Sequence, residues 1–175
     1  MTRRGRHDGG DGFTQMIDRH GGIIRKVAAT YCRDSDDRAD LAQEIMTQLW
    51  KAWPRYDPSR PFSTWMYRVA LNVAMSRMRD VYRGNRHFVR LTDEHREIAG
   101  AEVDHEANEQ LATLDHIVAG LDDLNRALLV LYLDDRRHSE IAEILGLTES
   151  NIGTKIARLK QRLRDQLALA QPIME

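Results

Sequence analysis

Guanidinium and amide side chains recur at helical spacing between residues 63 and 79. Arg68, Asn72, Ser76 and Arg79 lie three or four positions apart, so on a helix they share one face. The positions expected to face inward are apolar: Met66, Val69, Ala70 and Val73. Guanidinium groups pair with phosphates, and amides form hydrogen bonds with base edges. This pattern predicts a nucleic-acid-binding surface rather than a catalytic site.

A stiff loop precedes this helix. It holds three prolines within eight residues, 54–61, so the preceding helix must stop and the chain must run extended. The loop also carries an aromatic residue and two arginines. Ser63 or Thr64 then has the side chain to cap the new helix. We expect the loop to be suited to unpaired bases and their phosphates.

An amphipathic helix comes before the loop, after a polar turn at residues 33–38. Its apolar positions follow helical spacing: Leu41, Ala42, Ile45, Met46, Leu49, Trp50 and Trp53. Its opposite side is polar: Asp40, Gln43, Glu44, Thr47 and Lys51. One face is therefore expected to pack in the core while the other is offered to a partner.

Residues 138–164 read as a helix-turn-helix. Ser139 is the expected cap of a short first helix, Gly146 permits the sharp left-handed corner, and Thr148 is the expected cap of the second helix. Small Ala142 lets the two helices approach. The second helix presents polar and basic side chains where such helices meet the major groove: Ser150, Asn151, Thr154, Lys155 and Arg158.

Charge is segregated along a chain whose net charge is only -1. Residues 54–90 hold eight Arg against two acidic residues, 91–120 hold one Arg against eight, and 152–175 hold five basic against two. Two basic patches therefore flank an acidic connector, which fits an anionic partner at both ends.

The sequence offers no support for an enzyme. The seven His show no metal-ligand spacing, and there is no phosphate loop, nucleophile elbow or paired-carboxylate arrangement, so we expect no catalytic residues, metal or cofactor. Cys32 is the sole cysteine and is interpreted as a packed thiol in a reducing compartment. No apolar run is long enough for membrane insertion, which predicts a cytoplasmic protein.

Strand signals are absent, so the predicted fold is all-α, with two small helical domains joined by an acidic linker. We divide the chain into a flexible tail (1–12), a first domain (13–89), the linker (90–120), partly helical near its end, and a second domain (121–170). In the second domain, Asp122 or Asp123 is the expected cap of the first helix.

Three runs resemble bacterial RNA polymerase sigma factors of the extracytoplasmic-function (ECF) group, which keep only sigma regions 2 and 4. Residues 40–45 (DLAQEI), followed by Leu49 and Trp50, resemble the family's DLVQETF…LW run. Residues 62–70 (FSTWMYRVA) with Asn72 resemble its F-x-T-W-L-Y-R-I-A-x-N run, and 140–146 (EIAEILG) resemble its helix-turn-helix. The resemblance covers nearly the whole chain.

The resemblance implies a transcription initiation factor that binds core RNA polymerase through the β′ clamp helices and the β subunit, recognises promoter DNA, and pairs with an anti-sigma factor. Residues implied at the polymerase are Asp40, Leu41, Gln43, Glu44, Leu49 and Trp50. Those implied at the promoter's minus-ten element are Arg60, Phe62, Ser63, Thr64, Trp65, Arg68, Asn72, Ser76 and Arg79. At the minus-thirty-five element they are Ser150, Asn151, Thr154, Lys155 and Arg158. Gly153 stands where many relatives carry a base, which favours Lys155 and Arg158 as contacts.

Two other readings remain open. A stand-alone helix-turn-helix regulator would bind duplex DNA by itself and use the first domain for dimerisation, but it leaves the aromatic loop without a task. A small recombinase fragment would use the acidic residues between Asp93 and Asp104 as metal ligands, although a polar linker gives them no supporting core.

Overall fold

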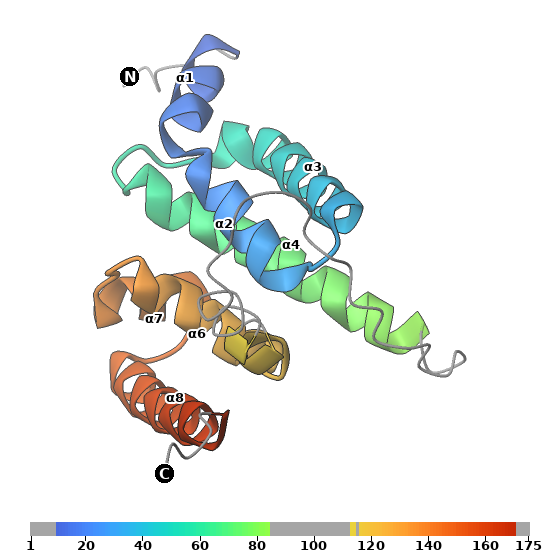
Figure 1. Cartoon of the computed structure of the whole chain (residues 1–175). Coiled ribbons are helices and arrows are strands. Elements are labelled where there is room, and N and C mark those ends of the chain that lie inside the picture. The colour runs from blue at the N-terminus through green and yellow to red at the C-terminus, as the bar shows by residue number, and fades with distance from the viewer. Residues whose placement is uncertain (1–9, 85–112, 115, 171–175) are drawn as a thin grey trace, which may run out of the picture.

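The computed structural model describes residues 10–84, 113, 114 and 116–170. Every regular element in these ranges is a helix, and the helices form two groups (Figure 1). The predicted all-α fold is therefore confirmed. The first nine residues and most of the predicted linker lie outside the described residues, so no structural statement is made about them.

The first domain packs three long helices side by side (Figure 1). Its elements are α1 (Asp11–His20), α2 (Gly22–Tyr31), α3 (Ser35–Ala52), the 3-10 turn η1 (Trp53–Arg55) and α4 (Phe62–Gly84). Apolar positions three and four apart on α2, α3 and α4 meet in a core whose fully buried members include Val27, Leu41, Ile45, Leu49, Met66 and Leu71. Gly21 separates α1 from α2.

Two helix starts differ from expectation. The predicted polar turn at 33–38 is shorter than expected, because α3 already begins at Ser35 and only residues 32–34 separate it from α2. The Asp34 carboxylate caps this start by accepting from the backbone N–H groups of Asp36 (2.8 Å) and Asp37 (3.3 Å). Likewise α4 begins at Phe62, so neither Ser63 nor Thr64 lies before the helix as its cap. The backbone N–H of Trp65 bonds instead to the carbonyl of Pro61 at 3.3 Å.

In the second domain, helical residues at 113, 114 and 116–119 precede three complete helices. They are α6 (Asp123–Leu133), α7 (His138–Leu145) and α8 (Glu149–Ala170). Gly146 lies between α7 and α8 with φ +67°, the left-handed conformation that glycine adopts without a Cβ penalty. The Thr148 hydroxyl accepts from the N–H of Asn151 at 3.3 Å, which confirms the predicted cap. The helix-turn-helix is thus built as its spacing predicts.

Two other caps of this domain are resolved by the structure. The Asp122 carboxylate, rather than that of Asp123, caps α6 by accepting from the N–H of Asn125 at 2.9 Å. The predicted cap at Ser139 is wrong: α7 begins at His138, and Arg137 is the cap residue. There the Glu140 carboxylate accepts from the backbone N–H of Arg137 at 3.1 Å. The side chain of Glu140 thus caps the first turn in place of the Ser139 hydroxyl.

The two domains pack against each other. Helix α7 lies beside the start of α4, and α6 meets α2 and α4 (Figure 1). Buried apolar side chains of both domains form one continuous cluster. The Tyr31 hydroxyl at the end of α2 donates to the carbonyl of Asp123 at 2.7 Å, and the Arg126 guanidinium lies 5.9 Å from the centre of the Tyr31 ring. Burial, together with nearby Asp123, raises the pKa of Tyr31.

Candidate nucleic-acid and protein interfaces

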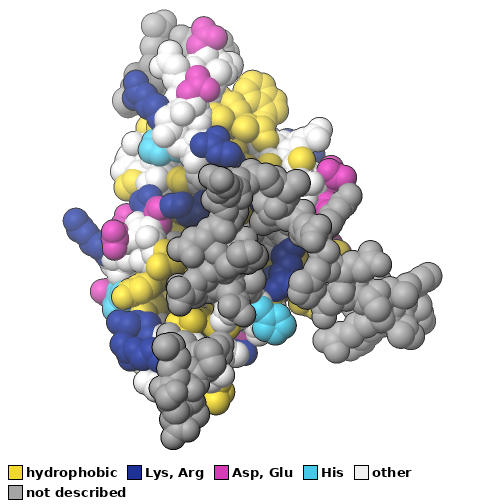
Figure 2. All heavy atoms as spheres, viewed as in Figure 1, with side chains coloured by type: hydrophobic (Ala, Val, Ile, Leu, Met, Phe, Trp, Pro, Cys, Tyr) yellow, Lys and Arg dark blue, Asp and Glu magenta, His cyan; other side chains and the backbone are white. Residues whose placement is uncertain are grey.

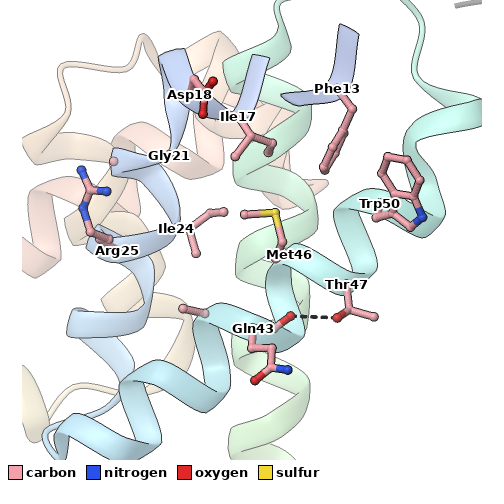
Figure 3. A pocket seen from close by; sticks show the side chains of 12 residues that line it. Phe13, Ile17, Asp18, Gly21, Ile24, Arg25, Gln43, Met46, Thr47 and Trp50 are labelled. Carbon is pink, nitrogen blue, oxygen red and sulfur yellow. Dashed lines mark hydrogen bonds between the residues drawn. The ribbon is translucent and has the colours of Figure 1, made fainter. Parts of the chain in front are cut away.

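An apolar groove runs between α3 and the α1–α2 pair. Its volume is about 760 Å³. Phe13, Ile17 and Ile24 face Met46 and Trp50 across it (Figure 3). Side chains on opposite walls leave this space open to solvent, and hydrophobic side chains reach the surface beside α1 and α3 (Figure 2). A groove of this shape suits an apolar helix face of a protein partner.

Polar side chains of α3 lie along this groove and outside it. Gln43 lines the groove, and Trp50, half-exposed at 51%, closes one end with its ring edge-on to Phe13 at 5.1 Å. Glu44 and Asp40 are exposed, and the Glu44 carboxylate lies 3.8 Å from the guanidinium of Arg77 on α4. Four of the six residues that the resemblance implies at the polymerase are therefore accessible: Asp40, Gln43, Glu44 and Trp50.

Two residues of the same predicted set are not accessible. Leu41 and Leu49 are fully buried in the core of the first domain. They fix the rotation of α3 and thereby direct Gln43 and Glu44 outward, so their part in any partner contact is indirect.

The loop before α4 is tied to a cluster of aromatic rings. Phe62 is only 4% exposed, and its ring centre lies 5.3 Å from that of Trp65, 5.5 Å from Tyr56 and 6.1 Å from Trp53. The sequence indicated an aromatic residue on an exposed loop and missed this packing. The recurrence of four aromatic residues within positions 53–65 was the available signal.

Hydrogen bonds stiffen the loop in addition to its prolines. The Tyr56 hydroxyl donates to the carbonyl of Arg60 at 2.8 Å, and the N–H of Ser59 donates to the Asp57 carboxylate at 3.0 Å. The bond from the Ser59 N–H lowers the pKa of Asp57 below its ordinary value, while burial of the Tyr56 ring raises the pKa of that phenol. The Arg60 guanidinium is consequently carried by a preorganised turn.

The predicted basic face of α4 is present. Arg68, Asn72, Ser76 and Arg79 are exposed on one side of the helix, and Trp65 is half-buried at its start. The Arg79 guanidinium donates to the Ser76 hydroxyl at 3.1 Å, which holds the two groups together. This surface offers amide and guanidinium donors to a polyanion.

The first residues of α4 have other surroundings. Thr64 is 3% exposed, and the Ser63 hydroxyl accepts from the guanidinium of Arg136, in the second domain, at 3.0 Å. In this arrangement the Thr64 hydroxyl is buried, and the partly buried Ser63 hydroxyl is already paired with the second domain. The position of the second domain decides their accessibility.

The outer face of α8 carries the predicted recognition residues. Ser150, Asn151, Thr154 and Arg158 are exposed, and Lys155 is partly exposed. The Thr154 hydroxyl donates to the carbonyl of Ser150 at 3.2 Å. Ile152, Ile156 and Leu159 are buried on the opposite side, so they fix this rotation of the helix. The arrangement matches a recognition helix with its polar first turns free.

Other kinds of site find no support among the described residues. No group of three His, Cys, Asp or Glu lies close enough there to hold a metal ion. The acidic residues between Asp93 and Asp104 lie outside those ranges. Cys32 is buried, and burial raises the pKa of its thiol. None of the helices in the described part is long and apolar enough to span a membrane.

Comparison with known families gives matches to both domains. Residues 16–84 match Sigma-70 region 2, and residues 111–163 match Sigma-70 region 4. RNA polymerase sigma factor CnrH of Cupriavidus metallidurans is 29% identical over 86% of this chain and 84% of its own length. ECF RNA polymerase sigma factor SigW of Bacillus subtilis is 28% identical over 90% of this chain and 89% of its own.

Solved structures show the same fold. CnrH in complex with the cytosolic domain of CnrY superimposes with a TM-score of 0.67 and 26% identity, over 91% of this chain and 90% of that one. The sigma factor RpoE of Bartonella quintana, in complex with the anti-sigma factor NepR, gives a TM-score of 0.73 and 19% identity, over 91% and 98%.

Proposed function

Because the chain belongs to the ECF group of bacterial RNA polymerase sigma factors, we propose which of its surfaces serve each step of transcription initiation. The protein is a transcription initiation factor that binds core RNA polymerase and directs it to specific promoters. The observation that supports the assignment of surfaces best is their combination in one chain: an open apolar groove on α3, a basic face on α4 and a helix-turn-helix.

The groove on α3 is assigned to core polymerase. A clamp helix of the β′ subunit would lay its apolar side chains between Met46 and Ile24, within hydrogen-bonding reach of Gln43. Asp40, Glu44 and Trp50 would contact the partner around the groove, while Leu41 and Leu49 act from the core by orienting α3. Contacts with the β subunit remain part of the same proposal without assigned residues.

The loop and α4 are assigned to the minus-ten element. Extruding a base from the stack costs a few kcal/mol, so the protein must supply phosphate anchors and a surface for the unpaired strand. Arg60, Arg68, Asn72, Ser76 and Arg79 are the exposed donors for this task. Phe62 serves indirectly as part of the aromatic cluster, with Trp65 partly exposed beside it. Promoter melting is proposed to follow from this capture.

The first turns of α8 are assigned to the minus-thirty-five element, which predicts different results for its two basic residues. If Lys155 binds a phosphate, Lys155→Ala should weaken binding to all duplexes and lower the salt slope by about 1. If Arg158 reads a base, Arg158→Ala should cost roughly 1–3 kcal/mol on the cognate element alone. Duplex titrations at several salt concentrations measure both effects. Identical losses on cognate and scrambled elements for Arg158→Ala would contradict a base-reading role.

Other properties are proposed from the family. We expect the protein to act in the cytoplasm, where its polymerase and promoter lie, and to carry no catalytic activity of its own. CnrH and RpoE are each seen with a regulator, CnrY and the anti-sigma factor NepR. An anti-sigma factor is accordingly the expected regulatory partner of this chain.

Run-off transcription separates this function from that of a stand-alone regulator. Core polymerase with this protein should transcribe a template carrying its promoter, and core polymerase alone should not. A stand-alone helix-turn-helix regulator would bind the same DNA without starting transcription. Specific DNA binding with no transcript, using active core enzyme, would favour the regulator.

A further inference from the structure

The second domain covers part of the surface assigned to the minus-ten strand. Glu143 on α7 places a carboxylate oxygen 2.5 Å from the guanidinium of Arg60, and Arg136 bonds to Ser63. Acidic and basic side chains lie together between the start of α4 and α7, at the left of Figure 2. A residue of the helix-turn-helix therefore pairs directly with a proposed DNA-binding arginine.

Both members of this pair line a small cavity. Its volume is about 40 Å³, and it is lined by Arg60, Thr64, Trp65, Arg68 and Glu143. The Thr64 hydroxyl oxygen is buried and has no hydrogen-bond partner among the described residues. Two arginines and a threonine with an unused hydroxyl thus line one cavity, and the only anionic residue in its lining is Glu143. Phosphate oxygens are the ligand chemistry that this set of donors fits best.

Further contacts hold α7 in place. The Asp134 carboxylate bonds to Lys26 of α2 and accepts from the Arg136 guanidinium at 3.1 Å. The Arg136 guanidinium also lies 5.2 Å from the centre of the buried Tyr67 ring. Although partial burial opposes ionisation of Asp134, hydrogen bonds from Lys26 and Arg136 help to lower its pKa. The Asp134 carboxyl is therefore ionised at neutral pH.

We propose that Arg60, Thr64 and Arg68 form a binding site for a DNA backbone phosphate and that the Glu143 carboxylate occupies this site while the two domains are closed. The second domain is then an intramolecular competitor of the promoter strand, and α7 must leave α4 before the strand binds. This inference rests on the proposed function, because it names the ligand group that the minus-ten surface takes.

The test uses the full-length chain without polymerase and a fluorescein-labelled oligothymidylate as probe. Because the Arg60–Glu143 pair is partly exposed, Glu143→Gln should raise affinity for the probe only about two- to fivefold. It should also speed amide hydrogen exchange in the loop and at the start of α4. Asp165→Asn on α8 is the matched control, since it removes the same charge from the same domain away from α7, and it should change neither readout.

Arg60→Ala distinguishes competition from simple opening. It breaks the same pair, so exchange should rise as in Glu143→Gln, but affinity for the probe should fall because a phosphate donor is lost. Equal behaviour of Glu143→Gln and Asp165→Asn would overturn the proposal, as would a gain in affinity with Arg60→Ala. Run-off transcription by the wild-type chain checks the proposed function separately. If the wild-type chain supported transcription but Glu143→Gln changed neither probe affinity nor hydrogen exchange, this inference alone would be refuted.

Discussion

Phe62→Ala should lower the free energy of unfolding by about 3–5 kcal/mol, the range for truncating a buried aromatic side chain. Phe62 is 4% exposed and contacts the rings of Trp53, Tyr56 and Trp65. Its removal leaves a cavity at the point where the loop meets α4. Chemical denaturation of the purified chain measures the loss.

Asn72→Ala is the matched control on the same helix. Asn72 is exposed, so the substitution should change the unfolding free energy by less than about 0.5 kcal/mol. It should nevertheless impair opening of a duplex promoter by holoenzyme, with the defect relieved on a template premelted around the minus-ten element. Unchanged stability of Phe62→Ala would show that the aromatic cluster does not support the loop.

Phe62 also shows where sequence reasoning reached its limit. Its place between a proline loop and a basic helix predicts contact with unpaired bases, and a direct DNA role would make Phe62→Ala a test of melting alone. The structure shows that the ring points into a cluster of residues 53–65, so a melting defect would be mixed with loss of stability. Loop composition alone does not reveal which way an aromatic ring points.

Local signals were sufficient for the helices and the sharp corner. Helical periodicity located α3, α4 and α8, and Gly146 and Thr148 marked the turn between α7 and α8 because their conformation and capping bond depend on near neighbours. The first residues of the helices were predicted less accurately than the helices themselves. At α7 the sequence predicted Ser139 as the cap, whereas the carboxylate of Glu140 accepts from the backbone N–H of Arg137.

Contacts between the domains were beyond such reasoning. Arg60 and Glu143 are separated by 83 positions, and Arg136 and Ser63 by 73, so no periodic pattern connects them. Charge counts predicted basic patches flanking an acidic connector. The acidic residue that pairs with Arg60 is nevertheless Glu143 of the helix-turn-helix. Opposite charges in a sequence indicate that pairing is favourable, whereas the packing of α7 on α4 determines which pairs form.

Replacing Gln43 and Glu44 together with alanine should weaken binding to core polymerase by roughly 2–4 kcal/mol, the loss expected for two central interface contacts. Both side chains are exposed on α3, so folding should change by less than about 1 kcal/mol, including the loss of the 3.8 Å approach of Glu44 to Arg77. Arg77 keeps its pair with Asp37 at 3.1 Å. Fluorescence titration of labelled protein with core polymerase measures the affinity.

The pair Gln161 and Asp165 on α8 supplies the control for this double substitution. These residues also present one amide and one carboxylate on an exposed helical surface, where they bond to each other at 2.8 Å. Their replacement by alanine should leave polymerase affinity unchanged. If both double variants bound core polymerase equally well, the polar side chains of α3 would not contribute to this affinity, and the groove on α3 would lose its assignment. A selective loss at Gln43 and Glu44 would place the polymerase contact on α3, because the two variants differ only in which helix face they alter.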